Sequence, residues 1–257
     1  SRALGRELAR LAYWVVPGLR SVTRAHVGLA YGDTLTERAK ARIAKGATEN
    51  LGIVAAEFTR IGQINREFVR KELSILGFEH VDRSRGGLVI SAHLGNREWL
   101  GPVVRTLHDK VAEVVRPLDD PRLDAFVDRV RRSNGVVTVR KYGAGAEIIR
   151  LLRAGYIVGV LVDQSPRQNA VPVEFFGRPC WSTVAPVMAA VRARAPVYAV
   201  AMTREPDGHY TLQFTPPIEM VRTGDLRKDL VENSQRCQAI IEQFVRTHPE
   251  PVSYTHL

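Results

Sequence analysis

The segment SAHLGNREWL, residues 91–100, places a histidine and a glutamate five positions apart at the end of an apolar run. A carboxylate that binds one imidazole nitrogen fixes the tautomer, so that the other nitrogen can take a proton from a hydroxyl. His93 would then be a general base, and Glu98 the residue that orients it. The competing interpretation is a structural histidine at a strand end, beside a solvated helix start.

The sequence offers this pair no nucleophile of its own. It contains no Gly-x-Ser-x-Gly elbow, and Cys180 and Cys237 fit neither a disulfide nor a zinc pattern. We therefore expect no metal and no cofactor. The glycines Gly143 and Gly145 lack the third glycine of a dinucleotide fingerprint, since Ile148 stands there. The activated hydroxyl would thus belong to a substrate.

Strands and helices alternate in the part of the chain that must position these residues. Apolar runs at GGLVISAHL, KVAEVVRPL, VVTVR, YIVGVLVDQ and APVYAVAMTRE are separated by helical segments of ten to fifteen residues. This alternation predicts crossover helices and a mostly parallel sheet. The segment HYTLQFTPP is expected to form a hairpin with the strand before it.

We expect a single α/β domain, with a helical lead-in over residues 1–75 and a catalytic core over 86–246. In the lead-in, Thr34 and Glu37 fit a capping box that would start a long helix. The opening ALGRELARLAYWVVPGLR is amphipathic and flanked by arginines, which suits either an interfacial segment or an ordinary core helix. Because the chain opens at Ser1 without an initiator methionine, we expect that residues precede it.

Four predicted strands end, in order, at His93, Arg116, Arg140 and Asp163. Ligands of open α/β sheets bind outside the carboxyl ends of the strands, so these residues predict a polar cleft. Asn96 is expected to cap a helix that starts near Arg97 and brings Glu98 close to the His93 ring.

The composition indicates which classes of binding partner the protein favours. The 257 residues are 45% hydrophobic and carry a formal net charge of +10, which favours anionic partners such as a phospholipid surface, an acidic carrier protein or nucleic acid. Nucleic acid ranks last, because the arginines are scattered without interleaved aromatic residues.

Several motifs together resemble the bacterial lipid A late acyltransferases, the lauroyl/myristoyl family within the lysophospholipid acyltransferase superfamily. They are SAHLGNREWLG, VVRPLDDPRLDAFVDRVR, GVLVDQ, VPVEFFGRPCWSTVAPVMAAVRARAPV and PPIE, in family order across about residues 30–248. The resemblance implies a glycerolphosphate-acyltransferase-like fold. It also implies transfer of an acyl chain from an acyl carrier protein thioester to a hydroxyl of a lipid A precursor, at the cytoplasmic face of the inner membrane.

The resemblance also implies roles for individual residues. His93 would be the base and Glu98 its orienting carboxylate. Arg116 would stabilise the oxyanion, with the backbone N–H groups of Gly95 and Asn96 as second candidates. Asp163 would hold Arg116, position substrate, or serve only as a buried ion-pair partner. The remaining substrate-binding candidates are Asn96, Gln164, Phe176, Gly177 and Arg178. Arg178 would lie near a phosphate, whereas Arg140 is expected to be a solvated charge.

Three departures from the family pattern stand out. Arg97 occupies a position that is usually aromatic, a hydrophobic N-terminal anchor would lie before Ser1, and PVSYTHL replaces a tryptophan- and arginine-rich tail. We expect residues 251–257 to be a truncated or artefactual end. Two alternatives stay open: an acyl-CoA-dependent acyltransferase of phosphatidylinositol mannoside or another glycolipid, and a non-catalytic lipid-binding protein of the membrane surface.

Overall fold

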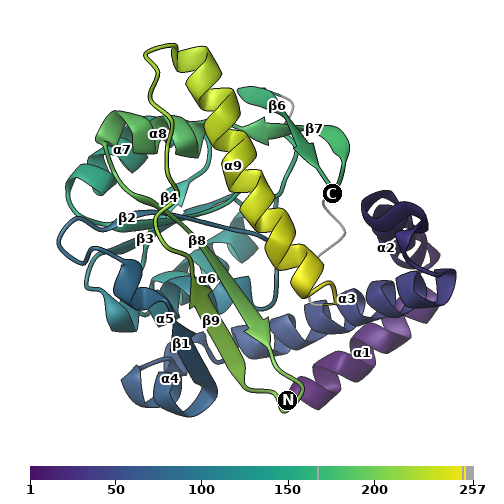
Figure 1. Ribbon diagram of the computed structural model, residues 1–257. Coiled ribbons are helices and arrows are strands. Elements are labelled where there is room, and N and C mark those ends of the chain that lie inside the picture. The colour runs from purple at the N-terminus through teal and green to yellow at the C-terminus, as the bar shows by residue number, and fades with distance from the viewer. Residues whose placement is uncertain (167, 251, 253–257) are drawn as a thin grey trace.

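The apolar runs form the centre of one seven-stranded sheet in the computed structural model, which describes residues 1–166, 168–250 and 252 (Figure 1). The strand order is β1-β9-β8-β2-β5-β3-β4. The strands are β1 (Leu73–Leu76), β2 (Gly87–Ser91), β3 (Val111–Val115), β4 (Val137–Arg140), β5 (Ile157–Leu161), β8 (Val197–Arg204) and β9 (Tyr210–Phe214).

The sheet is mostly parallel, which confirms the predicted class. Strands β8, β2, β5, β3 and β4 run parallel, and β9 turns back antiparallel to β8 as the expected hairpin. Strand β1 was not predicted: Leu73 begins a strand that pairs with β9, within the part of the chain that was expected to be a helical lead-in. A separate hairpin joins β6 (Ala170–Phe175) to β7 (Arg178–Thr183).

Helices cover both faces of the sheet because successive strand residues point to opposite sides. On β2, Leu88 and Ile90 pack into one core cluster with α7, α8 and α9, while Val89 packs into the other with α4 and α5. A fully buried aliphatic side chain of this kind contributes about 1.5–3 kcal/mol. The helices of the core are α5 (Leu100–Leu107), α6 (Pro121–Arg132), α7 (Gly145–Arg153), α8 (Ala185–Ala193) and α9 (Leu226–Thr247).

The lead-in is helical, as predicted, and consists of α1 (Arg2–Val15), α2 (Pro17–Tyr31), α3 (Glu37–Phe58) and α4 (Arg66–Glu72), with short 3-10 turns at Gly32–Thr34, Ile61–Gln63 and Phe78–His80. The cap of α3 is Thr36, whose hydroxyl accepts from the N–H of Ala39, so the expected cap at Thr34 is wrong. Thr34 instead ends the preceding 3-10 turn.

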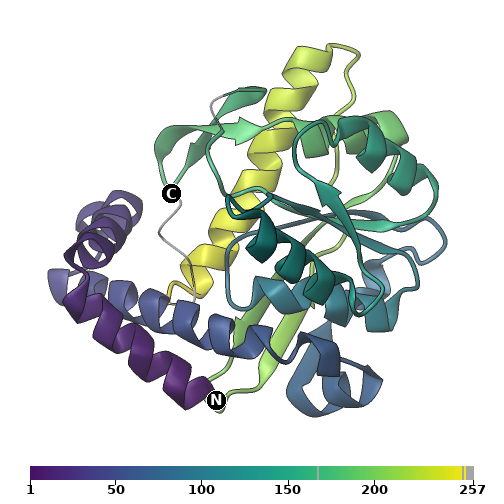
Figure 2. The ribbon, with the colours of Figure 1, turned by 180° about the vertical axis from the view of Figure 1, so that it is seen from behind.

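Helices α1 and α3 cross at a pair of glycines. A Cβ at Gly5 would lie 2.3 Å from the carbonyl oxygen of Gly52, and a Cβ at Gly52 would lie 2.2 Å from that of Gly5. The two helices therefore run side by side in close contact, as Figure 2 shows from behind. Within the described residues, no helix is both long enough and apolar enough to cross a bilayer.

The expectation of an artefactual end falls on residues 251–257, which lie outside the described residues apart from Val252. Val252 is buried and forms an isolated antiparallel bridge with Leu94, directly after His93.

Candidate functional site

His93 and Asp163 meet at the carboxyl edge of the sheet. His93 follows β2 and Asp163 follows β5, and these strands are neighbours whose last residues, Ser91 and Leu161, pair. Asp163 Oδ1 lies 2.8 Å from His93 Nδ1, while Asp163 Oδ2 accepts the backbone N–H of His93 at 2.7 Å. One carboxylate thus fixes both the ring and the backbone of the histidine, and both side chains are nearly buried.

This contact corrects two expectations. Glu98 was predicted to orient His93. Asp163 was predicted to hold Arg116, to position substrate or to be a buried ion-pair partner, and the last of these agrees with its contact to His93. In the structure, Asp163 is the carboxylate at His93 Nδ1, and Glu98 accepts two hydrogen bonds of 3.0 Å from Arg131. The reason is strand order: β5 lies between β2 and β3, so the residue after β5 reaches His93 first.

Glu98 is held by two cations. Besides Arg131, Arg97 lies 3.4 Å from its carboxylate. Burial would raise the pKa of Glu98, but the two guanidinium groups outweigh this effect and hold the pKa below its usual value. Glu98 is therefore an ionised, fixed carboxylate near His93.

A cavity of about 410 Å³ opens beside His93 and lies within the size range of roughly 300–1,000 Å³ typical of ligand sites. Its polar lining comprises Glu98, Arg131, Arg97, Arg116, Asp119, Glu113 and Gln164. Its apolar lining comes from the strands and α5, including Val104, Val111, Ile157, Leu161 and Val200. The cavity therefore combines charged side chains with an extensive apolar wall beside His93, which suits a ligand that has a reactive head and a hydrocarbon chain.

Glu113 is an acidic side chain inside this cavity. It lies on β3, is partly buried and lines the cavity. A Cβ on Gly101 would come within 2.7 Å of Glu113 Oε2, so the glycine in α5 makes room for the carboxyl group. Burial, and then the charge of Glu98, raise the pKa of Glu113 to about 7. The group is thus largely neutral below neutral pH.

Glu113 should make the stability of the protein depend on pH. Its pKa is about 7 when folded and 4.5 when unfolded, so its contribution is fully present below pH 4.5 and is lost as the pH rises through 7. Since one pKa unit corresponds to about 1.4 kcal/mol, the difference between these two pKa values limits the loss to about 3 kcal/mol. Urea unfolding between pH 4.5 and 8 should show a smaller decrease in Glu113→Gln than in the wild type. Equal pH slopes would contradict this prediction.

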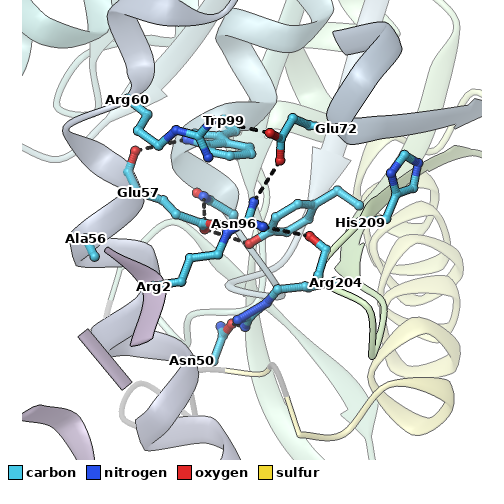
Figure 3. Close-up of polar contacts among 12 residues, drawn as sticks. Arg2, Asn50, Ala56, Glu57, Arg60, Glu72, Asn96, Trp99, Arg204 and His209 are labelled. Atoms are coloured by element: carbon cyan, nitrogen blue, oxygen red, sulfur yellow. Dashed lines mark hydrogen bonds and ion pairs between the residues drawn. The ribbon is translucent and has the colours of Figure 1, made fainter. Parts of the chain in front are cut away.

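Side-chain hydrogen bonds to α3 hold the loop after His93 in place. Gly95 has φ +63°, and its carbonyl oxygen accepts a hydrogen bond from Asn50 Nδ2 at 3.1 Å. Asn96 is fully buried, and its Nδ2 donates to Glu57 Oε2 at 2.8 Å (Figure 3). The loop is therefore bonded to two residues of one helix of the lead-in.

Asn96 thus differs from its prediction. Its side chain makes no capping hydrogen bond, because the residues that follow, Arg97–Trp99, form a 3-10 turn before α5. Its amide points into a buried polar cluster around Glu57, to which Arg2 and the hydroxyl of Tyr210 also bind (Figure 3). Asn96 is a structural residue that holds the loop, and the expectation that it binds substrate is corrected.

Arg116 follows β3 directly and lines the same cavity as His93. Its side chain is 64% exposed, and its described ion pair is with Asp119 at 3.8 Å. Arg140 is further away, at the edge strand β4, where it is 71% exposed and pairs with Asp124. The structure therefore brings Arg116 to the cavity and leaves Arg140 as a solvated charge.

A second cavity, of about 200 Å³, lies on the other side of Asp163. Gln164 lines both cavities, while Phe176 and Arg178 of the β6–β7 hairpin line this one. Arg178 Nε donates to the carbonyl oxygen of Leu29 on α2 at 2.9 Å. Gly177, with φ +68°, forms the turn of the hairpin. Four of the predicted substrate residues, Asp163, Gln164, Phe176 and Arg178, are thus brought to cavities, and Gly177 shapes the turn between the last two.

Sequence reasoning missed Glu113 and Arg131. Glu113 carried a signal, because it is the only charged residue within the strand VAEVV. Arg131 carried none, since it stands in a run of arginines near the end of α6 and is distinguished only by its contact with Glu98. Among the described residues, no group of three or more histidine, cysteine, aspartate or glutamate side chains is placed to hold a metal ion.

Comparison with known proteins gives two matches of different kinds. The sequence model of the family described as bacterial lipid A biosynthesis acyltransferase matches residues 1–257. Among solved structures, the chain is similar to the 1-acyl-sn-glycerophosphate acyltransferase PlsC from Thermotoga maritima, with a TM-score of 0.43 and 16% identity over 96% of this chain and 99% of that chain. No curated protein sequence matches.

Proposed function

We propose, from the premise that the chain belongs to the bacterial lipid A biosynthesis acyltransferase family and is an acyltransferase, that it acylates a hydroxyl of a lipid A precursor. The donor would be an acyl carrier protein thioester. The observation that carries this proposal is the His93–Asp163 pair beside a cavity whose lining is partly apolar. The pair supplies a base for an alcohol, and the cavity accommodates a hydrocarbon chain.

The reaction then follows from the geometry. With Asp163 bound at Nδ1, His93 takes the proton of the acceptor hydroxyl on Nε2, and the hydroxyl oxygen attacks the thioester carbonyl carbon. The tetrahedral intermediate collapses by breaking the carbon–sulfur bond, and the leaving thiolate takes the proton from the imidazolium. An ester and a free thiol are the products.

The two cavities suggest how the substrates are arranged. The acyl chain would enter the larger cavity and lie along the apolar residues that β2, β3 and β5 contribute to its lining. The acceptor lipid would approach from the side of the smaller cavity, where Arg178 can meet a phosphate. Both cavities reach Gln164, next to Asp163, so the two substrates would meet at His93.

The positive charge of the chain supports anionic partners. A formal net charge of +10 attracts an acidic carrier protein, a phosphorylated glycolipid and the anionic cytoplasmic face of the inner membrane, where the reaction would take place.

Arg116 is the proposed donor to the oxyanion, because it is the cationic residue that follows the strand next to β5 and lines the same cavity as His93. Arg116→Ala should lower kcat by roughly 100- to 1,000-fold with little change in the fold. Arg122→Ala, which removes an arginine from the exposed side of α6, is the control. Near-normal turnover of Arg116→Ala in a steady-state assay would exclude this role.

The function is tested with purified protein, a radiolabelled acyl–acyl carrier protein thioester and a lipid A precursor that lacks secondary acyl chains. We expect label in the lipid, with one free thiol released per ester formed. Absence of transfer under these conditions would overturn the proposal. If acyl-CoA supports transfer equally well in competition, the donor assignment fails and the acyl-CoA alternative replaces it. Lipid binding without turnover would favour the non-catalytic alternative.

A further inference from the structure

A groove outside the acyl-transfer site concentrates positive charge on the lead-in. It lies where α1, α2 and the start of α3 meet and has a volume of about 500 Å³. Its charged lining is entirely basic: Arg20, Arg24, Arg38, Arg42 and Lys45. We call these five residues and the space between them the basic groove.

The acidic residues near the basic groove leave much of this charge uncompensated. Glu37 is bound more closely by Lys40, at 2.7 Å, than by Arg24, at 3.8 Å. Within the described part of the chain, Arg20 and Arg38 have no acidic partner within 4 Å. Two cations of the groove are therefore available to an external anion.

The remaining cations are only weakly paired. Arg42 meets Glu250 at 3.2 Å, but both side chains are more than half exposed, and Lys45 lies 3.7 Å from Glu49. An exposed ion pair such as Arg42–Glu250 is worth about 0–1 kcal/mol, so an anionic ligand can displace it. Glu49 is bound more closely by Arg10, at 2.7 Å, than by Lys45.

An exposed apolar stripe lies beside the basic groove. Leu4, Leu8, Leu11 and Val15 are 58–66% exposed and recur at intervals of four, three and four residues along one side of α1. The buried side of the same helix is formed by Gly5, Ala9 and Tyr13, which pack toward α3. The apolar part of α1 is thus wider than the surface that the protein buries, and large exposed apolar patches mark interaction sites.

Trp14 joins the two features. Its ring is 62% exposed, lines the basic groove and lies 5.0 Å from the guanidinium carbon of Arg20. A tryptophan between apolar and cationic side chains is typical of the level of lipid headgroups. Figures 1 and 2 show α1 at the outer edge of the molecule, where a flat surface can reach it.

We propose that the basic groove binds the phosphate of an anionic phospholipid while the apolar stripe of α1 enters the headgroup layer of the same bilayer. A bilayer surface offers an apolar layer that the leucine stripe of the convex helix can enter and anionic phosphates that the cationic groove can bind. An acidic soluble protein would match the charge but leaves the convex apolar stripe without a counterpart.

This inference extends the proposed function, since a lipid acceptor brings the enzyme to a membrane. The binding is nevertheless measured without acyl transfer, so the two proposals fail separately. A protein that binds vesicles but transfers nothing would contradict only the function, and one that transfers but does not bind vesicles would contradict only the groove.

The test compares binding to vesicles of phosphatidylcholine with binding to vesicles that also contain phosphatidylglycerol. The groove variant is the triple substitution Arg20→Gln, Arg38→Gln and Arg42→Gln. Each basic residue near an anionic surface raises the affinity for the membrane about fivefold. The three substitutions together should therefore lower the affinity for the anionic vesicles, measured by co-sedimentation, roughly 100-fold. Binding of the wild type should also weaken at high salt.

The matched control removes the same charge elsewhere. Arg192→Gln, Arg222→Gln and Arg227→Gln alter exposed residues on α8 and near the start of α9, far from α1 (Figure 1). This variant should bind within a few-fold of the wild type. A third variant, Leu8→Ser with Leu11→Ser, tests the stripe and should weaken binding to both vesicle types. Thermal unfolding of each variant verifies that it is folded.

Three results would overturn the inference. The groove variant could bind anionic vesicles as well as the wild type. The control variant could lose as much binding as the groove variant, which would show only a general charge effect. The groove variant could lose affinity for purified acyl carrier protein while keeping vesicle binding, which would assign the groove to the carrier protein.

Discussion

Substitution of either member of the His93–Asp163 pair is expected to lower the rate of acyl transfer by roughly 10³- to 10⁴-fold while leaving the fold intact. The prediction is sharpest for Asp163→Asn. Asp163 Oδ2 accepts the backbone N–H of His93, so the asparagine oxygen must occupy that position. Its NH₂ group then faces Nδ1 and donates to it, which moves the ring proton to Nε2. Such a histidine cannot accept the proton of a substrate alcohol.

The measurement is kcat from the radiolabel assay for Asp163→Asn, His93→Ala and a control. Asp119→Asn is a suitable control, because Asp119 lines the same cavity but is 98% exposed. It should retain near-normal turnover. If Glu98→Gln lost activity and Asp163→Asn did not, the orienting role would return to Glu98, and the hydrogen bond at Nδ1 would have no catalytic consequence.

Gly95→Ala is expected to destabilise the protein by more than about 3 kcal/mol, and thereby to displace His93. Gly95 has φ +63°, a conformation that costs an alanine about 1 kcal/mol. In addition, a Cβ at this position would lie 1.6 Å from the carbonyl oxygen of Met202 on the central strand β8. The strand or the loop would have to move, and the loop starts two residues after the proposed base.

Gly143→Ala separates the two causes of this loss. Gly143 has φ +75°, but a Cβ there would meet no atom within 4 Å. The Gly143→Ala variant should therefore lose only about 1 kcal/mol of unfolding free energy, measured in urea, which is the cost of the left-handed backbone conformation. If Gly95→Ala and Gly143→Ala lowered the free energy of unfolding equally, β8 would be able to move aside at little cost, and close contact would not fix the loop.

The local pattern of the sequence was sufficient to predict most strands and helices of the core, but not strand β1. Continuous apolar runs such as GLVIS predicted buried strands, and the alternation with helices predicted a mostly parallel sheet. The same reasoning identified His93 as the residue at the end of a buried strand and placed Arg116 at the same edge. These predictions succeeded because side-chain periodicity and strand ends are properties of neighbouring residues.

The identity of each partner was decided only by the tertiary structure. Asp163 is 70 residues from His93 and reaches it because β5 inserts between β2 and β3. Glu98, five residues from His93, is drawn instead to Arg131 of α6, 33 residues away. The sequence by itself predicted that His93, Arg116 and Asp163 follow strands of one sheet and lie at the same edge of it. The order of the strands, which depends on how helices pack across whole faces of the sheet, decided which charges meet.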